Sequence, residues 1–73
     1  MKVLLYSTGQ CHLCELAATM LGAIPISVEH VDVTKDEVLM KKYGMHIPVV
    51  CRTDNNTELG WPFDADMLKR FLQ

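Results

Sequence analysis

Apolar residues follow two different spacings along this chain. Residues 2–6 (KVLLY) form a short, continuous apolar run that is typical of a buried strand. Residues 26–33 (ISVEHVDV) and 47–53 (IPVVCRT) are rich in β-branched residues and predict two more strands. A short fourth strand is predicted around residues 58–59, after a hairpin turn at DNN.

A helix is predicted directly after the first strand. From Cys11 to Gly22 the apolar residues recur three and four positions apart, which places them on one helix face, and Pro25 follows the end. This predicted face consists of Leu13, Leu16, Ala17, Met20 and Leu21. We expect it to pack against the sheet.

The second predicted helix begins with a capping box. Thr34 can cap the helix start, and Glu37 three residues later can bond back to it. Val33 and Val38 have the spacing of a hydrophobic staple. This helix is predicted to end at about Tyr43, before a glycine.

A last helix is predicted after Asp64, which can cap its first turn. Phe63 and Leu68 have staple spacing across this start. The residues expected on its buried side are Met67, Leu68, Phe71 and Leu72. The predicted order of elements is therefore β-α-β-α-β-β-α.

Composition narrows the class of protein. A hydrophobic fraction of 49% in 73 residues predicts one globular domain over residues 1–73. The net charge of -2, with no basic stripe, argues against a nucleic-acid partner. The run at the start of the chain is too short for a signal peptide or membrane span, so we expect a cytoplasmic protein with no membrane partner. In that compartment a Cys-x-x-Cys pair is more often catalytic or metal-binding than structural.

Cys11 and Cys14 stand at the predicted start of the first helix. Unpaired N–H groups and the helix dipole favour a thiolate at Cys11, whose pKa should therefore lie near ambient pH, the optimum for attack on a disulfide. Cys14 lies one turn further in, where it can attack a mixed disulfide formed at Cys11. The predicted function is therefore thiol-disulfide exchange, with Cys11 as nucleophile and Cys14 as resolving cysteine.

His12, between the two cysteines, has two interpretations. When protonated, its imidazole would stabilise a neighbouring thiolate. Alternatively, it is a solvated residue of an exposed first turn. Glu15 is interpreted as a solvated residue that the helix dipole favours.

Three segments carry a resemblance to a known family. YSTGQCHLC, HIPVV and ELGWPFD, in this element order, resemble the glutaredoxin-like branch of the thioredoxin fold over nearly the whole chain. The chain is particularly similar to a group of small glutaredoxin-like bacterial proteins. The resemblance implies an α/β, thioredoxin-like fold with a four-stranded mixed sheet and helices on both faces. It also implies the same nucleophilic and resolving roles for Cys11 and Cys14.

The resemblance further implies a substrate-binding surface. Pro48 would be the cis-proline beside the cysteine pair, and Ile47 would offer backbone hydrogen bonds to the substrate. We assign His12 to the same surface. The expected partner is a disulfide-containing protein or a small-molecule thiol. The protein itself is expected to be a monomer that needs no cofactor.

Departures from the glutaredoxin pattern put glutathione in doubt as a co-substrate. Thr8 stands where glutaredoxins usually carry a lysine that holds a glutathione carboxylate. His12 and Leu13 replace the usual proline and tyrosine, and Gly60 stands alone where a glycine pair is usual. The dithiol itself is unaffected by these changes.

We predict that the protein holds no metal ion. Two alternatives nevertheless involve soft metal ions at the cysteine pair. Copper-carrier domains also place Cys-x-x-Cys between a strand and a helix, but two strands follow that helix, whereas here a helix follows the second strand. Structural zinc would need two further ligands, and only His46 and Cys51 are candidates. We interpret Cys51 as a buried apolar residue and place His46 in the loop before Pro48, near the active site.

Trp61 raises the alternative of a pure interaction domain with an idle cysteine pair, for which this tryptophan would be an exposed anchor. A single tryptophan before a terminal helix more often covers the core. We therefore expect Trp61 to pack on the core.

Overall fold

Four strands form one mixed sheet in the order β2-β1-β3-β4 in a computed structural model that describes all of residues 1–73. β1 (Lys2–Ser7) pairs in parallel with β2 (Ser27–Asp32). β3 (Val49–Arg52) pairs antiparallel with β1, and β4 (Glu58–Gly60) pairs antiparallel with β3. The predicted number of strands and the mixed sheet are confirmed.

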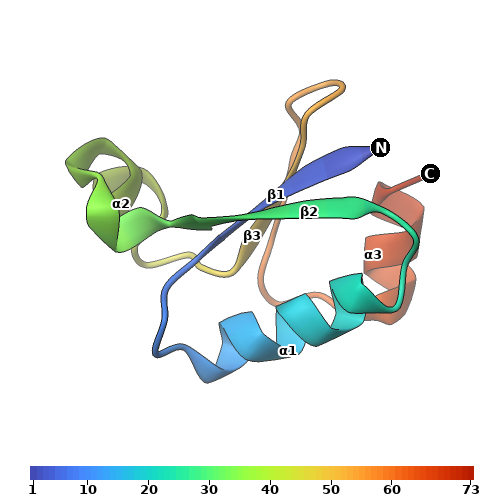
Figure 1. Cartoon of the computed structure of the whole chain (residues 1–73), viewed down its shortest axis with the longest axis horizontal. Coiled ribbons are helices and arrows are strands. Elements are labelled where there is room, and N and C mark those ends of the chain that lie inside the picture. Colours follow the sequence, from blue (N-terminus) through green and yellow to red (C-terminus); the bar gives the residue numbers. More distant parts are fainter.

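The helices are α1 (His12–Gly22), α2 (Glu37–Tyr43) and α3 (Ala65–Phe71), with a 3₁₀ turn, η1 (Val33–Lys35), before α2. Figure 1 shows α1 and α3 together below the sheet and α2 at one end of it. The predicted β-α-β-α-β-β-α order, with helices on both faces, is confirmed. None of the helices has the length and apolar character that a membrane crossing requires.

The main core lies between the sheet and the pair α1 and α3. Val3 and Leu5 of β1 point to this face because they are two residues apart, and Val50 of β3 joins them. The helices and the segment before α3 supply the rest of this cluster: Ala17, Leu21, Phe63, Leu68 and Leu72. The central place of β1, with a strand on each side, explains its continuous apolar run.

A smaller cluster covers the opposite face only where β1 ends. It is formed by Val33, Tyr43 and Val49, with Tyr6 packed against it. The rings of Tyr6 and Tyr43 stack with centroids 4.2 Å apart and 13° between their planes. α2 is therefore fixed to the sheet end at which β3 begins.

The buried face of α1 differs from the predicted one. Cys14, Ala17 and Leu21 face the core, whereas Leu13 and Leu16 are 40% and 41% exposed. The prediction was wrong for these two leucines because other small and apolar residues of α1 have the same helical spacing. They form a neighbouring stripe of the helix, and that stripe faces the core. The inward stripe is the one that contains the second cysteine.

The predicted capping box and staple of α2 were also wrong. The Asp32 carboxylate accepts from the Thr34 N–H at 2.9 Å and so caps η1 instead. Asp36 caps α2, accepting from Val38 and Leu39 N–H at 2.8 and 3.3 Å. Val38 is 72% exposed and cannot form a staple. Two aspartates, which are stronger acceptors than a threonine hydroxyl, divide the segment into the 3₁₀ turn η1 and the separate helix α2.

The start of α3 agrees with the prediction made from the sequence. Asp64 accepts from the Met67 N–H at 2.9 Å, and both Phe63 and Leu68 are buried. Met67 itself is 43% exposed, so its predicted place on the buried side was wrong. Leu68 and Leu72, which were predicted on the same side, are both in the core, and Phe71 packs against it.

Candidate active site

Three segments meet at the sheet end where β1 finishes. Tyr6 pairs with Val49, so the loop after β1 and the loop before β3 lie at the same end. Gly60, the last residue of β4, also pairs with Val49. The Trp61 N–H that follows donates to the Pro48 carbonyl at 3.1 Å. The cysteine pair, the proline loop and the segment after β4 are thus brought together by strand register.

Cys11 and Cys14 form a disulfide across the first turn of α1, with Cα atoms 5.2 Å apart. Cys11 is the N-cap residue, and its Sγ accepts the Cys14 backbone N–H at 3.2 Å. Cys14 is 4% exposed, whereas Cys11 is partly exposed. This geometry presents one sulfur to the surface and keeps its partner in the core.

His12 lies on the solvent side of the same turn. Its side chain is 80% exposed, and its Nδ1 lies 3.8 Å from Oε2 of Glu15, which is itself exposed. The observed position agrees with the interpretation of both residues as solvated members of the first turn.

The loop before β3 holds the two other predicted site residues. The Ile47–Pro48 bond is cis, as the resemblance implied, and Pro48 is fully buried. The Tyr43 carbonyl accepts from the His46 and Ile47 N–H groups at 2.8 and 3.1 Å. The Ile47 N–H is therefore engaged, whereas its carbonyl accepts no backbone hydrogen bond. A second cis bond, Trp61–Pro62, was not predicted.

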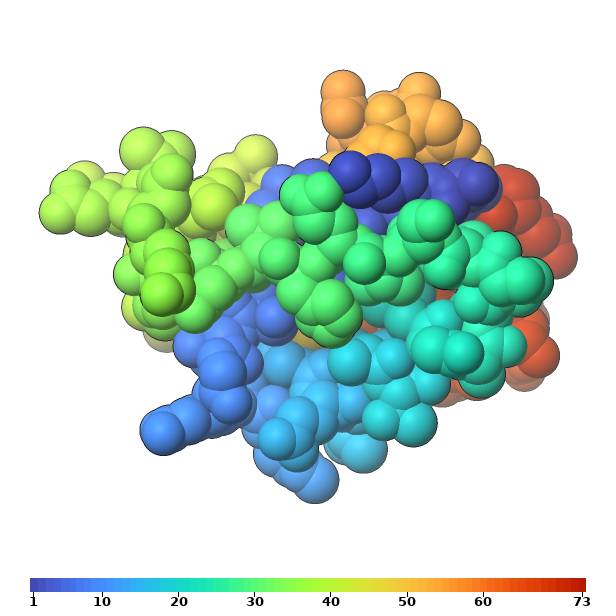
Figure 2. All heavy atoms as spheres, in the orientation of Figure 1, coloured from blue at the N-terminus to red at the C-terminus, as the bar shows by residue number.

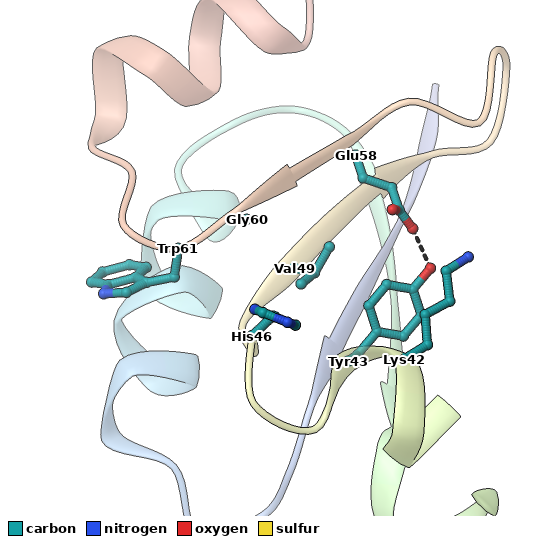
Figure 3. A pocket seen from close by; sticks show the side chains of 7 residues that line it. All are labelled: Lys42, Tyr43, His46, Val49, Glu58, Gly60 and Trp61. Atoms are coloured by element: carbon teal, nitrogen blue, oxygen red, sulfur yellow. Dashed lines mark hydrogen bonds between the residues drawn. The ribbon is translucent and has the colours of Figure 1, made fainter. Parts of the chain in front are cut away.

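A pocket of about 380 Å³ opens beside this loop. In Figure 3, Tyr43 and Lys42 from the end of α2 stand on one side and Trp61 on the other, with His46 and Val49 between them. Glu58 and Gly60 complete the lining. Of these seven lining residues, the sequence placed only His46 near the active site, because the others come from three separate elements and converge only in the fold.

Trp61 has two contacts. It packs against the main core, as predicted, with its ring edge-on to Phe63 at a centroid distance of 5.0 Å. It also lines the pocket, which the sequence did not indicate.

A hydrogen-bonded pair of side chains, Tyr43 and Glu58, lies on the side of the pocket opposite Trp61. The Tyr43 hydroxyl donates to the Glu58 carboxylate. Burial raises the pKa of Tyr43, and the nearby Glu58 carboxylate raises it further. Burial, followed by the same carboxylate, also raises the pKa of the Cys51 thiol. Cys51 is a free, buried cysteine, as predicted.

The zinc alternative lacks a ligand set. The structure contains no cluster of three or more His, Cys, Asp or Glu side chains that could hold a metal ion. His46 and Cys51 therefore do not complete a four-ligand site with Cys11 and Cys14.

Comparisons with known proteins agree with this architecture. The X-ray structure of Northeast Structural Genomics target protein XcR50 from X. campestris is similar, with 35% sequence identity and a TM-score of 0.89 over 96% of this chain and 93% of that one. The solution structure of the same target matches with 33% identity and a TM-score of 0.78, covering 99% of this chain and 92% of that one. No curated protein matches the chain.

A family model described as Glutaredoxin-like domain (DUF836) matches residues 2–73. This match covers both cysteines of the pair, the cis-proline loop and α3. The fold, the cysteine pair and the family match agree, and the chain belongs to the glutaredoxin-like domain (DUF836) family.

Proposed function

We propose that the protein is a thiol-disulfide oxidoreductase, with Cys11 as nucleophile and Cys14 as resolving cysteine. The observation that carries this proposal is the N-cap position of Cys11, whose Sγ accepts the Cys14 N–H at 3.2 Å while remaining partly exposed. In the reduced protein a Cys11 thiolate keeps that acceptor role at the positive end of α1. The substrate is a disulfide in a protein or a small molecule.

The reaction consists of two exchanges. The Cys11 thiolate attacks one substrate sulfur, so that a Cys11–substrate disulfide forms, the substrate disulfide breaks, and its other half leaves as a thiolate that takes a proton from water. Cys14 then loses its proton to solvent and attacks the Cys11 Sγ. The second half of the substrate leaves as a thiol. The two electrons lost by the dithiol are then on the two substrate thiols, and the Cys11–Cys14 disulfide is the oxidised form of the protein. An external thiol reductant restores the dithiol by the reverse exchanges.

Exposure supports this order of attack. Cys14 is only 4% exposed, so an external disulfide meets Cys11 first. Once Cys11 is part of a mixed disulfide, the neighbouring Cys14 is within bridging distance, since the two Cα atoms lie 5.2 Å apart. Ile47, through its free carbonyl, is the proposed substrate contact, with His12 at the exposed rim. Pro48, which was also expected to bind substrate, is buried and therefore supports this loop from below instead of contacting an external substrate directly.

A redox titration with thiol trapping tests this function. We expect one two-electron transition in which Cys11 and Cys14 change together, while Cys51 stays a thiol throughout. Metal analysis of the same sample provides the comparison with the copper alternative. Stoichiometric copper(I) bound by the pair, without any redox transition, would contradict the proposal.

A further inference from the structure

β4 is the outermost strand of the sheet, and only one of its edges is paired. The Arg52 N–H donates to the Thr57 carbonyl at 2.9 Å, and the Trp61 N–H donates to the Pro48 carbonyl at 3.1 Å. Hydrogen-bonded pairs in antiparallel strands recur at every second residue. Thr57, Leu59 and Trp61 therefore direct their backbone groups toward β3.

The intervening residues Glu58 and Gly60 consequently direct their N–H and C=O groups to the open edge. Such an edge is a template for an additional extended strand. The side chains of a strand added here would alternate between the two faces of the sheet, and every second one would lie beside Gly60 or Glu58.

The pocket lies on the face where such a side chain would project. Gly60 leaves a gap there, because a Cβ at this position would meet no atom within 4 Å. Val49, the cross-strand neighbour of Gly60, lines the gap, and the aromatic rings of Tyr43 and Trp61 border it. An aromatic side chain on a neighbouring strand commonly covers a strand glycine in this way.

The charged groups of the pocket are already engaged within the protein. The Glu58 carboxylate accepts from the Tyr43 hydroxyl, and the Lys42 ammonium lies over the Tyr43 ring, 5.1 Å from its centroid. The remaining lining is aromatic and aliphatic apart from His46. This lining favours an uncharged aromatic group over an ion.

We infer that the pocket receives an aromatic side chain of an extended polypeptide that pairs with the free edge of β4. Strand register places the pocket at the same end of the sheet as the Cys11–Cys14 pair, so the polypeptide would present its disulfide there. The identification of this polypeptide as the disulfide substrate rests on the proposed function. The inference of a peptide-binding surface itself rests only on the free edge of β4 and on the pocket.

Fluorescence of Trp61, the single tryptophan of the chain, provides a direct test. The probes are two blocked hexapeptides, one with a central phenylalanine among threonines and one with alanine at that position. The wild-type protein should bind the phenylalanine peptide at least about tenfold more tightly, because a ring is buried. Equal affinity for the two peptides would overturn the inference.

Gly60→Val places a branched side chain in the part of the pocket beside β4, at a strand position that suits valine. It should weaken binding of the phenylalanine peptide by about tenfold and leave the alanine peptide nearly unaffected. Gly22→Val is the matched control, because it adds the same side chain in open space at the other end of α1 from Cys11. Gly60→Ala replaces Gly60→Val if the larger variant does not fold. Unchanged affinity in a folded Gly60 variant would contradict the pocket assignment.

A kinetic experiment separates this inference from the proposed function. Each peptide is extended by a cysteine that carries a chromogenic aryl thiol in a mixed disulfide. Faster turnover of the phenylalanine peptide in the wild type, lost in Gly60→Val, supports both. Equal turnover of the two peptides leaves the redox function standing and overturns the identification of the bound polypeptide as the disulfide substrate. Selective binding without turnover supports the pocket and overturns the redox function.

Discussion

The Tyr43 hydroxyl donates a hydrogen bond to the Glu58 carboxylate and so joins the end of α2 to the edge strand β4. The same residue accepts the backbone N–H groups of His46 and Ile47 through its carbonyl. Tyr43 is 5% exposed and stacks on Tyr6 of β1. One buried tyrosine thus fixes the cis-proline loop relative to two strands.

Tyr43→Phe should lower the free energy of unfolding by about 1 kcal/mol, because it removes the hydroxyl and retains the stacked ring. Urea denaturation measures this change. Glu58→Gln is the control: its amide oxygen still accepts from Tyr43, so it should cost less. Equal stability of wild type and Tyr43→Phe would show that this bond adds nothing to the fold.

Alkaline pH should destabilise the protein through the same residue. The pKa of Tyr43 is raised above its ordinary value of 10.0 by burial and then by Glu58, so the unfolded chain loses this proton first as pH rises. The contribution of Tyr43 is therefore fully present below pH 10 and is lost as pH rises toward the folded pKa. Thermal unfolding should show a falling Tm above pH 10, with a shallower decline in Tyr43→Phe. Some decline should remain in that variant, since burial raises the pKa of Tyr6 as well.

Local patterns in the sequence predicted the element order, the Asp64 cap and the free state of Cys51. They failed where neighbouring residues offer equivalent choices, as for Thr34 beside Asp32 and Asp36. They also failed for Leu16, since periodicity does not decide which stripe of α1 faces the sheet. The pocket could not be predicted from the sequence for a different reason. Tyr43 and Gly60 are 17 positions apart in sequence, and only strand pairing brings them together.

Cys51 should be the least reactive thiol of the reduced protein. It is buried, and burial followed by the Glu58 charge raises its pKa, so little thiolate forms near neutral pH. In the Cys11→Ser/Cys14→Ser double variant, alkylation at pH 8 should be slow in the folded protein and at least ~10-fold faster in urea. A folded-state rate close to the unfolded rate would mean that Cys51 is accessible.

Glutathione-dependent turnover should be weak because Thr8 occupies the position where the resemblance to glutaredoxins implies a lysine. Thr8→Lys should lower the KM for a glutathione mixed disulfide by ~2- to 5-fold, the effect of one exposed ion pair. Thr8→Met controls for side-chain length without charge. Robust, saturable turnover by the wild type would show that Thr8 does not limit the use of glutathione.

The two cysteines should behave differently when replaced singly. Cys11→Ser should abolish attack on a disulfide, because a serine hydroxyl is not ionised at neutral pH and Cys14 is buried. Cys14→Ser should leave the first exchange intact and accumulate a mixed disulfide between Cys11 and the partner, detectable by mass spectrometry. The copper alternative instead expects each replacement to weaken ion binding, with no mixed disulfide.

Alkylation rates measured against pH in the two single variants establish which thiol leads. Cys11, left in Cys14→Ser, should react faster and at lower pH, because it sits at the N-cap with an N–H donor directed at its sulfur. Cys14, left in Cys11→Ser, lies one turn inside the helix and should require a higher pH. A more acidic and faster-reacting Cys14 would reverse the proposed roles, since the buried cysteine would then have to open the substrate disulfide and the exposed one to resolve it.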